Sequence, residues 1–206
     1  MYKRQCEDNG FVNPKYFLNV LSEKTNSDVY LSIEVGQNQI WCANNFNFKT
    51  PRSLLTSGGF GTMGYGLPAA IGASVAANGS KPVIAVMGDG SFQMDLPEMG
   101  TMAQWDIPVK MVLFQNHRLG MVHEHQYLLY KSNYQAVEIE GKPDFAMLAK
   151  AYGFESGVAN ENSEVSEAID KMMAHDGSYL LIVNVNPFEP TGDALNEATL
   201  PKKEDK

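Results

Sequence analysis

Short apolar runs alternate with helical patterns along most of this chain. Runs of this kind, bounded by polar or glycine-containing turns, are typical of buried strands. They fall at residues 28–35, 82–87, 109–115, 154–158 and 179–185. Helical patterns lie between and around them, at residues 14–21, 69–77, 144–152 and 164–174. This alternation predicts an α/β fold with a doubly wound, mostly parallel sheet of five to six strands and helices on both faces.

The length and composition fit one globular domain. Of the 206 residues, 44% are hydrophobic and 19% are charged. We expect a domain over residues 10–187, an unstructured or non-native start over 1–9, and a polar tail over 188–206. No apolar run is long enough to span a membrane, and Cys6 and Cys42 suggest no disulfide framework, which favours the cytoplasm. The net charge of −8 argues against nucleic acid as a partner, because such binding depends on basic contacts to phosphates.

The residues that follow two of the predicted strands indicate chemistry. One strand leads into Gly88, Asp89, Gly90 and Ser91, and the next leads into Asn116. The 25 residues from 91 to 115 are about the length of one helical crossover, which usually brings two such strands close together. Carboxylate and amide oxygens suit Mg²⁺, and the glycines allow a diphosphate to approach the backbone. The spacing therefore predicts a site for magnesium and a diphosphate.

Three other interpretations compete for these residues. Gly-Asp-Gly alone is most often a simple turn, but the flanking strand and helix and the second strand ending at Asn116 argue against that. Residues 59–64 (GFGTMG) match GxGxxG, which suggests a dinucleotide site. That interpretation leaves Asn116 unexplained. A zinc site is the third possibility, suggested by His117, His123 and His125, although clustered loop histidines are more often solvated or line a pocket.

Several blocks together resemble the acetolactate synthase (acetohydroxyacid synthase) large subunit. The resemblance covers roughly residues 10–186. The Gly-Asp-Gly to Asn pattern is shared by thiamine diphosphate enzymes in general, whereas the glycine-rich block at residues 56–73 is closer to acetolactate synthases. The matching blocks are 35–41 (VGQNQIW), 56–73 (TSGGFGTMGYGLPAAIGA), 88–94 (GDGSFQM), 108–110 (PVK) and 116–122 (NHRLGMV).

The resemblance implies the role of each residue in a domain that binds thiamine diphosphate and Mg²⁺. Asp89, Asn116 and the backbone carbonyl of Arg118 would bind the metal. Met63 would lie beneath the cofactor and hold it bent. The cofactor-binding residues implied by the resemblance are Val35, Gly36, Gln37, Asn38, Gly61, Met63, Gly88, Gly90, Ser91, Gly120 and Met121.

The resemblance also implies a carboligase that condenses pyruvate with a second 2-oxo acid in branched-chain amino acid biosynthesis. The activating glutamate of the family comes from the pyrimidine-binding domain of another subunit, in a homodimer or larger assembly. Glu34, Glu98 and Glu124 do not lie in the expected context. FAD is possible in the full-length enzyme but would not be bound by this domain alone. We therefore expect a fragment or subunit that is inactive alone; a split 2-oxo acid decarboxylase or another thiamine diphosphate enzyme, or a non-catalytic cofactor-binding domain, is the alternative.

Three departures from the family pattern affect the choice of substrate. Asn38 occupies a position where the family usually has His. His125 occupies a position where many members have Trp or Gln, which shapes the pocket for the second oxo acid. Residues 186–206 lack the apolar C-terminal segment that is usual in the family. These residues leave the second substrate open.

Overall fold

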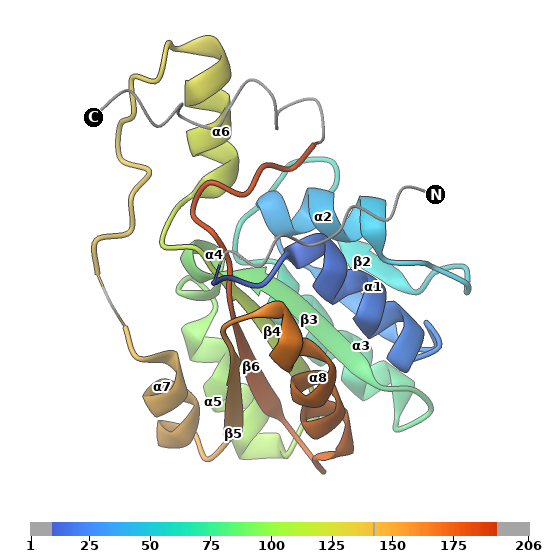
Figure 1. Ribbon diagram of the computed structural model, residues 1–206. Coiled ribbons are helices and arrows are strands. Elements are labelled where there is room, and N and C mark those ends of the chain that lie inside the picture. Colours follow the sequence, from blue (N-terminus) through green and yellow to red (C-terminus); the bar gives the residue numbers. More distant parts are fainter. Residues whose placement is uncertain (1–9, 142, 193–206) are drawn as a thin grey trace.

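A computed structural model describes residues 10–141 and 143–192, and they form one parallel sheet covered by helices (Figure 1). The six strands lie in the order β2-β1-β3-β4-β6-β5, and every neighbouring pair is parallel. The strands are β1 (Tyr30–Ile33), β2 (Leu54–Thr56), β3 (Val83–Gly88), β4 (Lys110–Gln115), β5 (Glu155–Ala159) and β6 (Tyr179–Asn184). The predicted fold class is confirmed.

Helices cover both faces of this sheet, and each face has its own apolar core. On one face α1, α2 and α8 pack around Phe17, Trp41 and Ile169. On the other face α3, α4, α5 and α7 pack around Leu67, Met99 and other buried residues. The helices are α1 (Pro14–Lys24), α2 (Gln37–Asn45), α3 (Gly66–Ala77), α4 (Asp89–Phe92), α5 (Leu96–Trp105), α6 (Gly120–Leu129), α7 (Phe145–Ala151) and α8 (Val165–Ala174), with a 3-10 turn at Asn162–Glu164.

Capping side chains explain where two of the predicted helices begin. The Oδ1 of Asn13 accepts hydrogen bonds from the N–H groups of Lys15 and Tyr16, and Pro14 occupies the first helical position of α1. Asp144 caps α7 in the same way by accepting from the N–H of Met147. The three-residue strand β2 and the helices α2 and α6 are absent from the sequence prediction.

The order of the central strands determines where the site lies. β3 lies between β1 and β4, and Gly88 at the end of β3 is level with Phe114 near the end of β4. The three chain segments that follow β1, β3 and β4 therefore leave the sheet side by side, at its carboxyl edge. This confirms the expectation that the two strands before Asp89 and Asn116 are neighbours. Ligands of open α/β sheets bind at this edge.

The chain beyond residue 187 continues to pack against the domain as far as the description extends. The indole N–H of Trp41 donates to the carbonyl of Pro190 over 3.0 Å. Both the N–H and the hydroxyl of Thr191 donate to the Oε1 of Glu124. The predicted start (1–9) and the rest of the predicted tail (193–206) lie outside the described residues. Within the described residues, 10–141 and 143–192, none of the helices has the length and apolar character needed to cross a membrane.

Candidate cofactor site

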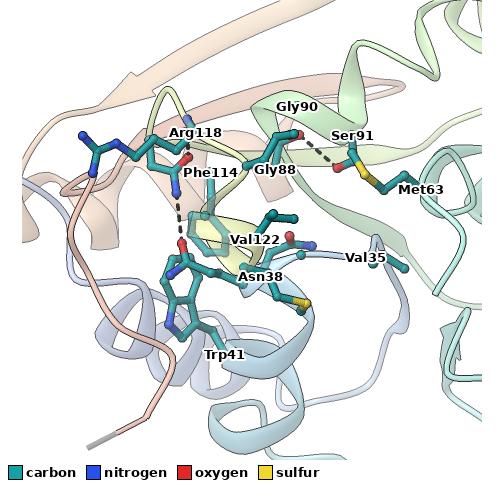
Figure 2. A pocket seen from close by; sticks show the side chains of 16 residues that line it. Val35, Asn38, Trp41, Met63, Gly88, Gly90, Ser91, Phe114, Arg118 and Val122 are labelled. Carbon is teal, nitrogen blue, oxygen red and sulfur yellow. Dashed lines mark hydrogen bonds between the residues drawn. The ribbon is translucent and has the colours of Figure 1, made fainter. Parts of the chain in front are cut away.

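A pocket opens at the carboxyl edge of the sheet, between the ends of β1, β3 and β4 (Figure 2). Trp41 and Phe114 contribute its aromatic wall, with their ring centroids 5.8 Å apart. Met63 and Val35 approach from the opposite side in the close-up view. The lining residues are Val35, Gly36, Gln37, Asn38, Trp41, Met63, Gly88, Gly90, Ser91, Phe114, Asn116, Arg118, Leu119, Gly120, Met121 and Val122.

Three helices begin at this pocket, and none of them has a capping side chain. α2 follows Gly36, α4 follows Gly88, and α6 follows Leu119, and none of these three N-cap residues makes a capping hydrogen bond with its side chain. Uncapped helix starts present N–H groups that need acceptors, and the helix dipole favours negative charge there. Their convergence suits an anion with several oxygens, such as a diphosphate.

Glycines keep this pocket open. A Cβ atom at Gly90 would lie 2.5 Å from the Cδ2 of Leu119, and one at Gly120 would overlap the amide group of Gln37. Gly36 has a φ of +146°, a backbone conformation that other residues rarely adopt. Side chains at these positions would occupy the pocket or distort its backbone. The glycine-rich segments therefore allow a ligand to contact the main chain directly.

Asp89 lies beside the pocket with one carboxylate oxygen unsatisfied. Its Oδ2 accepts a 2.6 Å hydrogen bond from the N–H of His117, whereas no donor among the described residues reaches the buried Oδ1. Burial raises the pKa of Asp89 to about 6, although the N–H groups of His117, Gly90 and Asn116 oppose that shift. A buried carboxylate oxygen without a partner is costly unless a cation or a donor completes it. The position fits a Mg²⁺ ligand.

Asn116 lies next to Asp89, and hydrogen bonds of its side-chain amide fix its position. Its Nδ2 donates to the Oε1 of Gln37 over 3.1 Å, and its Oδ1 accepts from the N–H of Arg118. The Gln37 amide in turn donates to the Oε2 of Glu124 and to the carbonyl of Glu189. The amide oxygen of Asn116 has two lone pairs, so the bond from Arg118 leaves it able to bind a metal.

Backbone and side-chain contacts hold Arg118 in place beyond the end of β4. The N–H of Leu119 donates to the carbonyl of Val137, and the N–H of Ile139 donates to the carbonyl of His117. The Nε of Arg118 pairs with Glu138 at 2.8 Å, and its guanidinium lies 4.1 Å from the ring centroid of Phe188. The charged side chain is therefore engaged elsewhere, while its main chain borders the pocket. This arrangement is compatible with a ligand role for the backbone carbonyl.

Of the eleven predicted cofactor-binding residues, only Gly61 lies outside the pocket lining. Gly61 is exposed on the loop before α3 and has a φ of +63°. Asn38 lines the pocket, but its Nδ2 donates to the carbonyls of Glu34 and Val86. The hydroxyl of Ser91 donates to the carbonyl of Gly88. Asn38 thus also connects the segment after β1 to β3, whereas the bond from Ser91 is local.

The three histidines expected in a loop do not converge, because His123 and His125 lie on α6 and only His117 lies in a loop. His123 stacks on Tyr134 at a centroid distance of 4.1 Å, and burial lowers its pKa. His125 is exposed, with its ring 5.8 Å from that of Tyr130, and His117 is also exposed. Across residues 10–141 and 143–192, no group of three or more His, Cys, Asp or Glu side chains is placed to hold a metal ion. The histidines therefore give no support to a zinc site.

Four lining residues were not among the predicted site residues: Trp41, Phe114, Leu119 and Val122. Trp41, Leu119 and Val122 lie within the blocks that carry the resemblance, so only their role was missed. Phe114 belongs to a strand and follows the same apolar pattern as the core. Nothing in the local sequence distinguishes a core position near the end of a strand from a position that lines a ligand pocket.

A doubly wound parallel sheet with an anion pocket at its carboxyl edge defines an α/β domain for a phosphorylated ligand. Residues 34–183 match the family model described as thiamine pyrophosphate enzyme, C-terminal TPP binding domain. The chain therefore belongs to this family, as the thiamine pyrophosphate (thiamine diphosphate) binding domain. This result also excludes the dinucleotide interpretation of residues 59–64.

Named relatives agree with the resemblance noted in the sequence. The acetolactate synthase isozyme 2 large subunit of Escherichia coli (strain K12) is 40% identical over 172 residues, which cover 84% of this chain and 31% of the relative. The probable acetolactate synthase large subunit of Methanococcus aeolicus is 44% identical over 162 residues, covering 79% of this chain and 27% of the relative. The chain thus spans less than a third of the length of either relative.

Two decarboxylases of known structure have a similar fold. A benzoylformate decarboxylase from Polynucleobacter necessarius superposes with a TM-score of 0.77 at 27% identity, over 85% of this chain and 33% of that one. A thiamine diphosphate-dependent 4-hydroxybenzoylformate decarboxylase from Rhodococcus jostii reaches a TM-score of 0.82 at 22% identity, over 92% of this chain and 36% of that one. The second likeness, at this identity, shows the fold alone.

Proposed function

We propose that this chain binds the diphosphate of thiamine diphosphate through Mg²⁺, as part of an acetolactate synthase-like carboligase. The observation that carries the proposal is the unpaired, buried Oδ1 of Asp89 at the edge of a pocket where three uncapped helices begin. A divalent cation at Asp89 would satisfy that oxygen and bind the diphosphate at the same time. Identities of 40–44% to acetolactate synthase large subunits support the carboligase class.

The proposed ligands are Asp89, the amide oxygen of Asn116 and the backbone carbonyl of Arg118. The first N–H groups of α2 and α6 would bind the diphosphate oxygens, and Met63 would support the rest of the cofactor. When bound, thiamine diphosphate supplies a carbon nucleophile that adds to a 2-oxo acid and stabilises the charge left when CO₂ departs. The residues of this chain hold and orient the cofactor, so the proposed substrates, pyruvate and a second 2-oxo acid, meet it at the open side of the pocket.

A second domain is proposed to cover the Met63 side of the pocket. Phe60, in the loop before Met63, is 100% exposed. Met94, which follows the Gly88 segment in the sequence, is 59% exposed. Large apolar side chains that are exposed next to the segments of a site are typical of protein interfaces. A pyrimidine-binding domain of another subunit would cover them and supply the activating glutamate.

Isothermal titration calorimetry of the chain with thiamine diphosphate, with Mg²⁺ and with EDTA, tests the proposal. We expect binding with Mg²⁺ and at least a tenfold loss in EDTA, since a metal that bridges the diphosphate contributes well over 1.4 kcal/mol. Thiamine without phosphates is the control and is expected not to bind measurably. Equal affinity for thiamine and thiamine diphosphate, or no binding with Mg²⁺, would refute the proposal.

The chain alone is expected not to convert pyruvate to acetolactate. Glu34 is buried against the backbone before α3, Glu124 is bonded to Thr191 and Gln37, and Glu98 lies on α5, so none is proposed to activate the cofactor. Purified chain with thiamine diphosphate, Mg²⁺ and pyruvate should give no acetolactate in a colorimetric assay. Acetolactate formation by the chain at any rate above the protein-free control would show that the account of the missing glutamate is wrong.

A further inference from the structure

Glu34, the residue that follows β1, has a fully buried carboxyl group that binds the start of α3. Its Oε2 accepts hydrogen bonds from the N–H groups of Gly64, Tyr65 and Gly66, at 3.2, 3.1 and 2.9 Å. Its Oε1 accepts from the N–H of Val35 at 2.9 Å. α3 has no side-chain cap of its own, so this carboxylate from a distant strand takes that role. The segment that it holds directly follows Met63.

Asp95 faces the same carboxyl group from the other side. It stands at the N-cap position of α5 but does not cap that helix, although Asp is a favoured capping residue. Instead, its buried side chain lies within hydrogen-bonding reach of Glu34, and no other donor among the described residues reaches its Oδ2. Two carboxyl groups form a hydrogen bond only when one of them keeps a proton. Burial, followed by the Glu34 carboxyl, raises the pKa of Asp95 to about 7.

The two side chains connect three segments that border the pocket. Glu34 immediately precedes Val35 and Gly36, the Met63 segment is bound to its carboxylate, and Asp95 follows the turn that begins with Gly88. Asp95 also lies against the Met63 segment itself, because its Oδ1 would be 3.3 Å from a Cβ atom at Gly64. Neither carboxyl group lines the pocket, so each acts on it through the segments that it holds.

We propose that Glu34 and Asp95 share one proton and act as a positioning pair, which holds residues 64–66, and through them the adjoining Met63, against the cofactor pocket. Loss of the shared proton places two buried negative charges side by side, and their repulsion releases the segment. The proposal rests on the proposed function only in that the pocket binds thiamine diphosphate. Cofactor binding is therefore expected to depend on the protonation of a group that never touches the cofactor.

The charged surroundings of Asp95 favour this shared proton. The titratable groups that act on it are Glu34, directly after β1, and Glu98 on α5, and both disfavour a negative charge on Asp95. α3 presents only backbone, through the N–H of Leu67, which stabilises the ionised form in part. No cation among these groups would stabilise the doubly ionised pair. The proton is therefore lost as the pH rises through about 7, the pKa of Asp95.

Asp95→Asn separates this effect from other pH effects on binding, because its amide N–H donates to Glu34 at every pH. Affinities for thiamine diphosphate with Mg²⁺ are measured at pH 6 and pH 8 for both proteins. Only about a tenth of the wild-type pairs keep the proton at pH 8, so the ratio of wild-type to variant Kd should rise about tenfold between these pH values. Asp144→Asn, which keeps its cap on α7, is the matched control and should track the wild type.

A second measurement needs no cofactor. In protein with ¹³C-labelled methionine methyl groups, the Met63 signal, assigned by its loss in Met63→Leu, should shift with a midpoint near pH 7 in the wild type and stay constant in Asp95→Asn. The exposed Met147 should not shift in either protein. A pH-independent Met63 signal in the wild type, or the same titration in both proteins, would refute the proposal that Glu34 and Asp95 share a proton. If neither protein binds the cofactor, the proposed function fails, but the Met63 titration still tests whether Glu34 and Asp95 share a proton.

Discussion

Asp89→Asn is expected to weaken Mg²⁺-dependent binding of thiamine diphosphate on the order of a hundredfold or more, because it removes a charged metal ligand. The substitution keeps the shape of the side chain. Its amide oxygen can still accept the hydrogen bond from the N–H of His117, which holds the segment after β4. The loss should therefore come from the missing negative charge rather than from a changed backbone.

The stability of the ligand-free protein should change in the opposite direction. Asp89 is buried with one unpaired oxygen, and its pKa of about 6 means that it is mostly ionised at pH 7. The folded state therefore bears the cost of a buried charge at pH 7, which a neutral amide removes. We expect the thermal midpoint of Asp89→Asn without ligand to equal or exceed that of the wild type. Weaker binding together with retained stability is typical of a ligand-binding residue.

Asp170→Asn is the matched control, since Asp170 is an exposed residue of α8 that pairs with Lys24. It should bind the cofactor as the wild type does, and calorimetry with a thermal melt of each protein provides both readouts. If Asp89→Asn binds thiamine diphosphate and Mg²⁺ with unchanged affinity, the assignment of Asp89 as a metal ligand is wrong.

Gly36→Ala is expected to destabilise the fold by about 2–4 kcal/mol, because both its backbone and its surroundings exclude a side chain. The φ of +146° at Gly36 is unfavourable for any residue with a Cβ atom. That atom would also lie 2.5 Å from the Oδ1 of Asn38. Asn38 cannot turn away without breaking its hydrogen bonds to the carbonyls of Glu34 and Val86.

The same substitution should disturb the start of α2, and so weaken cofactor binding in the fraction that folds. Urea denaturation measures the free energy of unfolding, and Gly59→Ala is the matched control. A Cβ atom at Gly59 meets no atom within 4 Å, so that variant should differ from the wild type by less than about 0.5 kcal/mol. Equal stability of Gly36→Ala and Gly59→Ala would contradict the account of this turn.

The sequence was sufficient for the fold class and for the neighbouring strands at the site. The central strands β3, β4 and β6 are buried on both faces, so each appears as a continuous apolar run. The N-caps Asn13 and Asp144 gave the starts of two helices. β2 could not be predicted in this way, because it has three residues at the edge of the sheet and one of them, Leu54, is exposed.

The residues of the site were predictable where they belong to a local motif. Asp89 and Asn116 follow strands directly, and the glycines mark close backbone approaches. Contacts that join distant segments have no such local pattern. Examples are the bridge from Gln37 to Glu124, 87 residues apart, and the packing of Asp95 against Glu34. Only the folded chain brings these groups together, which is why Glu34 appeared in the sequence merely as a glutamate in the wrong context.

Asp89, Asn116 and the carbonyl of Arg118 are proposed to bind a metal that holds the diphosphate. Crystals of the chain grown with thiamine diphosphate and Mn²⁺ in place of Mg²⁺ test it directly, because anomalous scattering locates manganese. We expect one peak at roughly 2.1 Å from the Oδ1 of Asp89, the Oδ1 of Asn116 and the main-chain oxygen of Arg118, with the diphosphate completing the coordination. Bound cofactor with its manganese away from Asp89 would contradict it.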